Sequence, residues 1–249
     1  MLKYLNAMIK KRLPKGSRKG ISRENKDLVA SIQLVRISCM KKVQSAFKPL
    51  LIISCTAVLL SGCATPPPQN TSNLCEIFYE HRDWYDAAAA MRDKWGVPIH
   101  VPMSIMYQES SFKHNAKPPM RWFLGFIPYG RASSAYGYSQ AKTVTWDEYV
   151  KEADRFWASR DDFEDAIDFM GWFISKSQRL NGVSKWDGYA QYLNYHEGWG
   201  GYKRGSYKKK AWLIQTAKKV DSRAKTYAAQ LKTCEDDLKR GWLWRLFFG

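Results

Sequence analysis

Apolar residues recur at helical spacing from about residue 73 onward, and strand patterns are few. Polar capping residues precede several of these segments, and glycine or proline stands where they end. Thr145-Trp146-Asp147-Glu148 and Ser159-Arg160-Asp161-Asp162 have the form of capping boxes. The pattern predicts a mainly α fold. The expected helices run from Asn73 to Met91, from Pro102 to Glu109, from Thr145 onward, from Ser159 to Gly182, from Ser184 to Gly198 and from Ser206 to Lys232.

The segment from Lys113 to Tyr138 interrupts this helical pattern. It holds three prolines, three glycines and the apolar run from Trp122 to Ile127. Because proline and glycine interrupt regular structure, the segment predicts a long loop that carries aromatic residues.

The N-terminal part has the features of a secretory signal. Met40-Lys41-Lys42 precedes an apolar run from Leu50 to Leu60. A positive flank, a short apolar core and small residues before the cut are typical of signal peptides, and the run is too short for a transmembrane helix. Leu60-Ser61-Gly62-Cys63 resembles a bacterial lipobox. This resemblance implies cleavage before Cys63 and lipidation of its sulfur.

The regions around the signal complete the expected organisation. Residues 1–39 are rich in Lys and Arg and lack apolar periodicity, which favours an over-extended gene start over a long cytoplasmic n-region. By resemblance to Gram-negative lipoproteins, Ala64 favours the outer membrane, facing the periplasm. The expected parts are an extension (1–39), a signal peptide (40–62), a lipidated Cys with a Pro-rich tether (63–72), a folded domain (73–234) and a Trp-rich tail (235–249) that either packs on the domain or lies at the membrane interface.

The charge distribution argues against a nucleic-acid partner. The formal net charge is +17, but residues 1–62 hold 13 Lys and Arg against two Asp and Glu. The remainder therefore has a net charge of +6, which suits a polyanionic cell-wall substrate. With 11 Trp, 14 Tyr and 11 Phe, the chain can fill its core and still line a carbohydrate-stacking groove.

The cysteines also fit an envelope protein. They stand at positions 39, 55, 63, 75 and 234, and maturation would remove the first two and lipidate the third. Cys75 and Cys234 remain, near the two ends of the folded region. An even pair in an oxidising compartment predicts a disulfide between the first and last helices, and two free buried thiols are the alternative.

Glu109 is the candidate for acid chemistry. It ends a short apolar helix and is followed by Ser110-Ser111-Phe112. Cleaving a glycosidic bond requires a carboxylic acid that is still protonated near neutral pH, and apolar surroundings favour the protonated form. A surface glutamate at a helix end is the alternative.

Four segments resemble one enzyme family. Glu109-Ser110-Ser111-Phe112 is similar to the Glu-Ser-x-Phe motif of soluble lytic transglycosylases, and Ala135 to Gln140 is similar to their Gly-Leu-Met-Gln motif. Asp165 to Gly182 resembles their long central helix, and Tyr195-His196-Glu197-Gly198 stands where Tyr-Asn-Ala-Gly is expected. The order and spacing match over roughly residues 97–202.

The resemblance implies a single lysozyme-like domain, of the goose-type lysozyme and lytic transglycosylase kind. It implies cleavage of the β-1,4 bond between N-acetylmuramic acid and N-acetylglucosamine in peptidoglycan, with a 1,6-anhydromuramyl product. Glu109 would act as acid and then as base, without a cofactor, in a protein expected to be a monomer. Tyr195 would orient Glu109 or the sugar. The substrate-binding candidates are Ser110, Gly137, Tyr138, Ser139, Gln140, Tyr195, His196 and Glu197.

Departures from the family pattern leave two alternatives. Tyr138-Ser139 replaces Leu-Met, and His196-Glu197 replaces Asn-Ala. Glu197 could be a second catalytic carboxylate, which would make the protein a hydrolytic muramidase. It could instead cap a helix or form a salt bridge. Loss of turnover would leave a peptidoglycan-binding scaffold.

The histidines predict no metal site. His81, His100, His114 and His196 show no ligand spacing relative to one another. His196 stands among aromatic residues, where a hydrogen-bonding role is expected.

Overall fold

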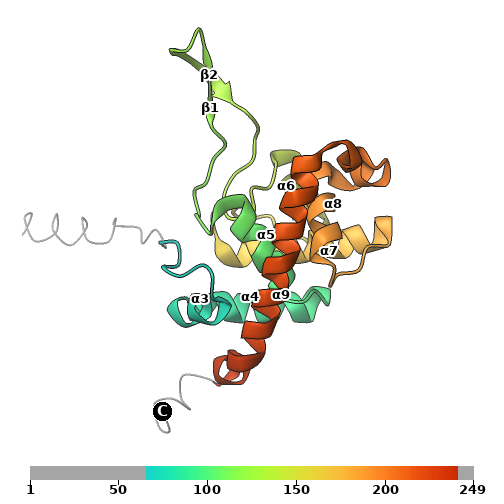
Figure 1. The fold of residues 1–249 in the computed structure, drawn as a ribbon. Coiled ribbons are helices and arrows are strands. Elements are labelled where there is room, and N and C mark those ends of the chain that lie inside the picture. Colours follow the sequence, from blue (N-terminus) through green and yellow to red (C-terminus); the bar gives the residue numbers. More distant parts are fainter. Residues whose placement is uncertain (1–65, 241–249) are drawn as a thin grey trace, which may run out of the picture. The chain divides into compact units, whose positions relative to one another are not determined.

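A computed structural model describes residues 66–240, and Figure 1 shows how its helices are arranged. The expected extension, the signal peptide, Cys63 and the tail beyond residue 240 lie outside the described residues, so these expectations stay predictions. The elements are α3 (Leu74–Glu80), α4 (Arg82–Trp95), α5 (His100–Ser110), β1 (Met120–Phe123), β2 (Ile127–Arg131), α6 (Thr143–Glu152), α7 (Phe163–Asn181), α8 (Gly188–Lys203), a 3-10 turn (Ser206–Lys209) and α9 (Ala211–Lys239).

The helix α7 is the centre of the fold. Twelve of its 19 residues are buried, and α4, α5, α6 and α8 pack around it. A helix that is apolar on most sides is stable in water only when other elements cover those sides. The mainly α fold class is confirmed.

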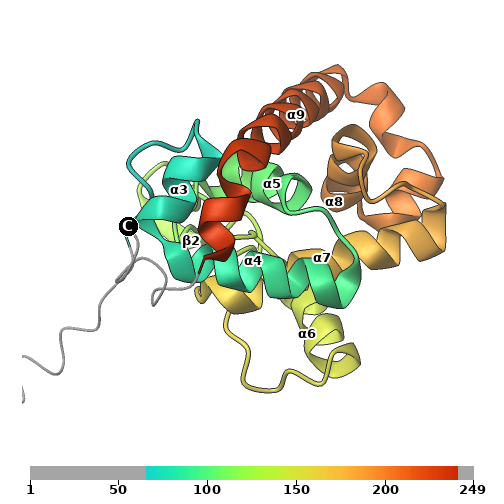
Figure 2. The same ribbon diagram turned by 90° about the horizontal axis from the view of Figure 1, so that it is seen from below.

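The helix α9 covers the other side of α5. It contacts α3, α5 and α8, and Figure 2 shows it running past α3 and α5. Its buried residues recur every three or four positions from Leu213 to Leu238, which forms one apolar stripe. α5 therefore lies between α7 and α9, and every residue from Val101 to Met106 is buried. None of the helices within residues 66–240 is long and apolar enough to cross a membrane.

Several helix ends follow the predicted signals. The Asn73 side chain accepts hydrogen bonds from the backbone N–H groups of Cys75 and Glu76 at the start of α3. Asp187 caps α8 in the same way, and Gly182 closes α7 in the left-handed conformation that glycine favours. α7 begins one residue after Asp162, which accepts from the Asp165 N–H, so Asp162 is the cap and not Ser159.

Other boundaries differ from the prediction. The expected first helix is divided at His81, whose φ of −126° and ψ of 82° interrupt the helical backbone. α6 starts at Thr143 because the Thr143 N–H donates to the distant Ser134 Oγ, so the expected capping box at Thr145 is wrong. The end predicted at Gly198 is present, however, because Gly198 has a non-helical φ of 72° and ψ of 162°, and a second helical part of α8 follows it to Lys203.

The C-terminal elements also differ from the prediction. Ser206 starts a 3-10 turn, and α9 follows from Ala211 and continues past Lys232 to Lys239.

The segment that predicted a loop contains a β-hairpin. β1 and β2 pair antiparallel, with Phe123 opposite Ile127 and a register shift after Arg121. All nine strand residues are exposed. The strands therefore lack the alternation of apolar and polar residues by which a half-buried strand is recognised in a sequence. In Figure 1 the hairpin projects away from the helices.

A disulfide closes the helical domain. Cys75 at the start of α3 and Cys234 near the end of α9 are bonded, with Cα atoms 6.0 Å apart and a sequence separation of 159. The two ends of the domain are therefore joined covalently. The described residues 66–240 belong to one compact unit, and the core and the disulfide lie within it. We infer that this unit folds without residues 1–63.

Removing the disulfide should destabilise the unit. We expect a Cys75→Ala/Cys234→Ala variant to lose about 2–4 kcal/mol of unfolding free energy, because a long loop is no longer closed in the unfolded chain. Denaturant unfolding of residues 64–249 measures this difference. A reducing agent should lower the stability of the unmodified unit to that of the variant and leave the variant unchanged. Equal midpoints for the oxidised unit and the variant would contradict the expectation.

Candidate active site

A sharp turn after α5 places Glu109. Ser111 and Phe112 follow the helix with φ values of 52° and 59°, a left-handed conformation that is uncommon for residues other than glycine. The Phe112 side chain is fully buried against Trp84 and Tyr107. Burial of this ring holds the turn in place, and Glu109 lies in the last turn of the helix before it.

Hydrogen bonds fasten the segment from Ala135 to Gln140 beside this turn. The Ser110 Oγ donates to the Tyr138 carbonyl at 2.6 Å. Gly137 has a φ of 77°, and a Cβ there would lie 1.9 Å from the Arg160 carbonyl oxygen. Only glycine fits this close approach of two backbone segments. The first and second motifs of the sequence therefore meet through the Ser110 side chain, and Gly137 packs its segment against the backbone at Arg160.

The helix α8 also contacts the segment from Ala135 to Gln140. The Tyr195 hydroxyl donates to the Ser139 carbonyl at 2.5 Å, and its ring packs edge-on against Phe173 of α7 with centroids 4.9 Å apart. Segments that are far apart in sequence thus converge around Glu109.

A pocket of about 490 Å³ lies at this point of convergence. Its walls come from the end of α5, the two stems of the hairpin, the start of α6, α7 and α8. The residues that line it are Glu109, Pro118, Pro119, Ser133, Ala135, Gln140, Ala141, Lys142, Thr145, Phe169, Phe173, Tyr195, His196, Glu197, Gly198 and Trp199.

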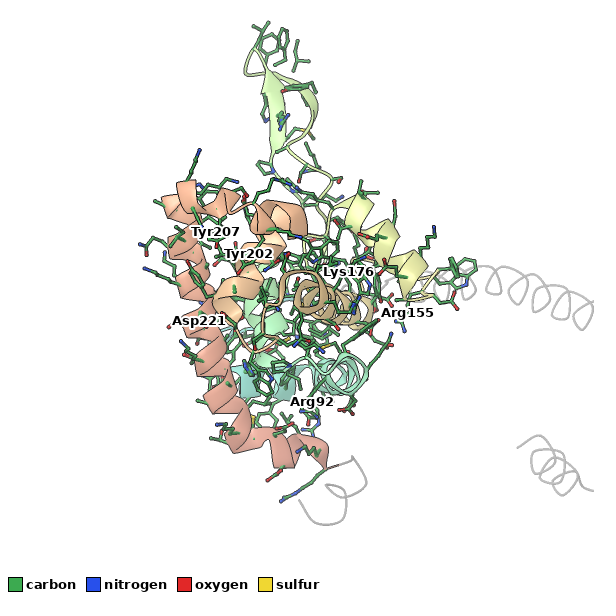
Figure 3. All side chains as sticks on the ribbon, turned by 90° about the vertical axis from the view of Figure 1, so that its right-hand side faces the viewer. Arg92, Arg155, Lys176, Tyr202, Tyr207 and Asp221 are labelled. Atoms are coloured by element: carbon green, nitrogen blue, oxygen red, sulfur yellow. A yellow bond between two sulfur atoms is a disulfide. The ribbon has the colours of Figure 1, made fainter. Side chains whose placement is uncertain are left out.

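One wall of the pocket is aromatic. The rings of Phe173 and Trp199 are stacked with centroids 4.7 Å apart. The Trp199 indole N–H donates to the Ser177 Oγ at 3.0 Å, and the Lys176 ammonium, labelled in Figure 3, lies 4.9 Å from the Trp199 ring centroid. These contacts hold both rings in place as a fixed apolar wall of the pocket.

Burial raises the pKa of Glu109 to about 7, and a hydrogen bond from Tyr192 opposes the rise by stabilising the carboxylate. The side chain is half-buried and lines the pocket. Its position in the last turn of α5 acts in the same direction as burial, because the carbonyl end of a helix disfavours a negative charge. Near neutral pH, both the protonated and the ionised forms of Glu109 are therefore populated.

The sequence did not single out Tyr192 as a site residue. Burial and the nearby charge of Glu109 raise its pKa, and its hydroxyl hydrogen-bonds to the Glu109 carboxyl. Tyr195 follows it by three residues on α8, so both rings face the same side of the helix, and burial and the charge of Glu109 also raise the pKa of Tyr195. The spacing of three residues from Tyr195 was the feature of the sequence from which Tyr192 could have been recognised as a site residue.

The predicted substrate-binding residues divide into two groups. Gln140, Tyr195, His196 and Glu197 line the pocket. Ser110, Gly137, Tyr138 and Ser139 do not line it. Tyr138 is buried against Trp84 and Phe163, and Ser139 is fully buried, so these residues support the pocket from behind instead of facing a substrate.

Glu197 is tied down by three partners. Its carboxylate accepts from the Lys210 ammonium at 2.7 Å and from Ser206, and it lies 3.0 Å from His196 Nδ1. Burial opposes ionisation, but the hydrogen bonds from Lys210, Ser206 and His196 outweigh it and lower the pKa of Glu197 to about 2. Glu197 therefore joins the kinked end of α8 to the residues before α9 as a stable anion.

Among residues 66–240, no group of three or more His, Cys, Asp or Glu side chains is arranged to hold a metal ion.

Comparison with known proteins identifies the fold. A family model described as the transglycosylase SLT domain matches residues 51–234. The chain belongs to the transglycosylase SLT-domain family. No curated protein matches the chain. SLT domains are lysozyme-like, so the predicted fold and the family resemblance are both confirmed.

Family membership supports a peptidoglycan-related function of the lytic transglycosylase type. In this SLT domain the matched range includes α3 to α8 and most of α9, and it therefore contains every segment that lines the pocket. The pocket at Glu109 is the candidate active site of the domain.

A pH-dependent stability measurement tests the burial of Glu109. Since its pKa in the folded state is about 7 and its reference value is 4.5, the carboxyl is protonated in both states at pH 4. As pH rises from 4.5 to 7, ionisation favours the unfolded chain and the protein loses stability. The unfolding free energy of Glu109→Gln, taken relative to that of the unmodified unit at the same pH, should therefore be about 2–3 kcal/mol higher at pH 8 than at pH 4.

The matched control is Glu164→Gln, because the Glu164 side chain on α7 is 69% exposed. Denaturant unfolding of the three proteins at several pH values should show a pH-dependent gain for Glu109→Gln alone. A gain that is the same at pH 4 and pH 8 would show that Glu109 titrates normally.

Proposed function

We propose that this SLT domain is a lytic transglycosylase that cleaves the β-1,4 bond between N-acetylmuramic acid and N-acetylglucosamine, with Glu109 as the only catalytic carboxyl group. The observation that carries the proposal is the Glu109 pKa of about 7 in a pocket with an aromatic wall. A single group that first donates and then accepts a proton works best when its pKa lies near the working pH.

In the first step, protonated Glu109 donates its proton to the glycosidic oxygen. The bond between the muramyl anomeric carbon and this oxygen breaks, and N-acetylglucosamine leaves with a free 4-hydroxyl group. The acetamido group of the muramyl residue helps to stabilise the positive charge that develops at the anomeric carbon. Glu109 is now a carboxylate, and the hydrogen bond from Tyr192 stabilises this ionised form.

In the second step, the muramyl C6 hydroxyl attacks the anomeric carbon from within the same sugar. The Glu109 carboxylate takes the hydroxyl proton, and a 1,6-anhydro ring closes. The proton returns to the carboxyl group, so the enzyme is restored and no water is consumed. Half-buried Glu109 and the apolar wall of Phe173 and Trp199 favour this intramolecular attack by limiting the water near the reacting carbon.

The other pocket residues have supporting roles in this proposal. Tyr195 fixes the Ser139 carbonyl through its hydroxyl and presents its ring to the pocket. The Gln140 side-chain amide donates to the Ala116 carbonyl at 2.8 Å and to the Gly137 carbonyl at 3.0 Å. Its side-chain oxygen is the group that could accept a hydrogen bond from a sugar hydroxyl.

A hydrolytic muramidase is the second candidate, and Glu197 is the observation that favours it. Glu197 is ionised and lines the same pocket as Glu109, as a second catalytic carboxylate would. Its oxygens are already engaged by Lys210, Ser206 and His196, however. Because both carboxylate oxygens are held in these contacts, a structural role for Glu197 is favoured over a role as base or nucleophile.

The location of the enzyme is part of the proposal. The lipobox-like sequence that ends at Cys63 supports a lipid-anchored protein of the outer membrane that faces the periplasm, next to the peptidoglycan. Mass spectrometry of Cys63 in the protein isolated from membranes would test the anchor.

Digestion of purified peptidoglycan tests the reaction. Residues 64–249 should release products with 1,6-anhydromuramyl ends, and Glu109→Gln should reduce the rate by at least about 100-fold, because it removes the proton donor. Mass spectrometry identifies the ends. Glu197→Gln is the matched second variant, and it should give the same anhydro product at a reduced rate.

The alternatives predict different products. Reducing muramic ends that disappear in Glu197→Gln would establish the hydrolase. Binding to peptidoglycan without any released product from the unmodified domain would establish the scaffold.

Tyr192→Phe tests the hydrogen bond to Glu109. Since this bond lowers the Glu109 pKa, its loss should raise that pKa and move the high-pH limb of the rate profile to higher pH. Tyr189→Phe, on the same helix, removes a hydroxyl without a contact to Glu109 in the described structure and should leave the limb in place. A drop in rate with no displacement of the limb would contradict the role of Tyr192.

A further inference from the structure

The β1–β2 hairpin exposes an unusual amount of apolar surface. Seven of the 14 exposed large hydrophobic side chains within residues 66–240 lie between Met120 and Tyr129, so half of this surface is concentrated in one small element. Leu124 and Phe126 at the tip are 71% and 69% exposed. A contiguous exposed apolar patch on a soluble domain marks a contact surface.

The apolar side chains lie on both faces of the hairpin. Phe123 and Ile127 are opposite each other in the ladder and share one face, and Trp122, the preceding residue, points to the other face. Figure 3 shows side chains standing out around the hairpin's tip, away from the helices. A protein groove or a flat partner would cover only one face, whereas a fluid apolar medium covers both.

The acidic and basic side chains carried by the hairpin and its flanking segments are all basic. The segment 113–142 contains no Asp or Glu, and its basic residues are Lys113, Lys117, Arg121, Arg131 and Lys142. Two of these are fixed at the base of the hairpin, where Arg121 donates to the Ala132 carbonyl at 3.1 Å and Arg131 donates to the Pro118 carbonyl at 2.7 Å. Basic residues below an aromatic and aliphatic tip complement an anionic lipid surface.

The backbone limits how deeply such an element can enter. A two-stranded hairpin leaves its outer N–H and C=O groups unpaired, and unpaired backbone groups are strongly disfavoured in hydrocarbon. In the headgroup region they can still bond to water and lipid oxygens. Trp, Tyr and Phe also favour this interfacial depth.

We infer that the tip of the β1–β2 hairpin inserts into the headgroup region of an anionic phospholipid bilayer. Leu124 and Phe126 enter deepest, Trp122, Phe123 and Ile127 follow, and Arg121 and Arg131 contact lipid phosphates. Pro118, Pro119 and Ser133 in the stems of the hairpin line the pocket, so this contact would hold the pocket at a set height above the bilayer.

A glycan strand fits this surface less well. The residues from Trp122 to Tyr129 do not line the pocket, and the aliphatic side chains of Leu124 and Ile127 have no flat ring for a sugar to stack on. The inference is independent of the proposed reaction, since lipid binding needs no turnover.

Vesicle flotation with residues 64–249 tests the inference, because this unit lacks Cys63 and cannot be lipid-anchored. The unit should bind vesicles of phosphatidylcholine mixed with phosphatidylglycerol, bind pure phosphatidylcholine more weakly, and lose binding as salt rises. Leu124→Ser/Phe126→Ser should weaken binding by at least about tenfold. Phe156→Ser/Trp157→Ser is the matched control, since these exposed residues lie outside the hairpin, and it should bind like the unmodified unit.

Some results would overturn the inference. One is that the unmodified unit does not bind vesicles. Another is that both double variants lose vesicle binding to the same extent. A dimer of the unmodified unit in sedimentation experiments that becomes a monomer in Leu124→Ser/Phe126→Ser would assign the tip to self-association instead. An unchanged denaturant-unfolding midpoint of the tip variant shows that it is folded, so its failure to float reports only on lipid binding.

Discussion

The burial of one ionisable carboxyl group is the constraint on which the rest of the site depends. Glu109 ends a helix whose preceding residues are almost all buried between α7 and α9. An isolated carboxylate in such surroundings is disfavoured, so the protein either tolerates a neutral acid or loses stability as the group ionises. The large core around α7 and the covalent closure between Cys75 and Cys234 supply the stability that this arrangement requires.

The segments around Glu109 are fixed by side chains that bond to backbone carbonyls and by one close approach of two backbones. Ser110 bonds to the Tyr138 carbonyl, Tyr195 bonds to the Ser139 carbonyl, and Gly137 lets its segment approach Arg160 closely. These contacts explain why motif residues are found at the site without facing the pocket. A motif that resembles an active-site signature therefore contains two kinds of residue, those that meet the substrate and those that hold the backbone.

Much of the fold was predictable from local signals in the sequence. Asn73, Asp187 and Gly182 act where capping chemistry predicts, because a cap depends on only a few neighbouring residues. The break at His81 has no such signal, since neither proline nor glycine marks it. The start of α6 depends on Ser134, which is distant in sequence, and local patterns cannot reveal a partner of that kind.

The same distinction applies to the site. The short spacing between Glu109 and Phe112 and the apolar residues before them predicted a buried acid. The aromatic wall of Phe173 and Trp199 could not be predicted, because α7 is apolar on most sides and its periodicity does not show which face meets the pocket. Tyr192 was hidden for a similar reason, since only the packing of α8 against α5 brings it to Glu109.

The two carboxyl groups in the pocket show how environment divides their roles. Glu109 has a phenol as its hydrogen-bond partner, so burial dominates and raises its pKa. Glu197 has an ammonium, a hydroxyl and an imidazole as partners, so hydrogen bonding dominates and lowers its pKa. Of these two carboxyl groups, Glu109 is the one that has both protonated and ionised forms populated near neutral pH. A reaction in which the substrate's own hydroxyl attacks needs one such group, whereas a two-acid hydrolysis would require Glu197 to release the contacts that hold the end of α8.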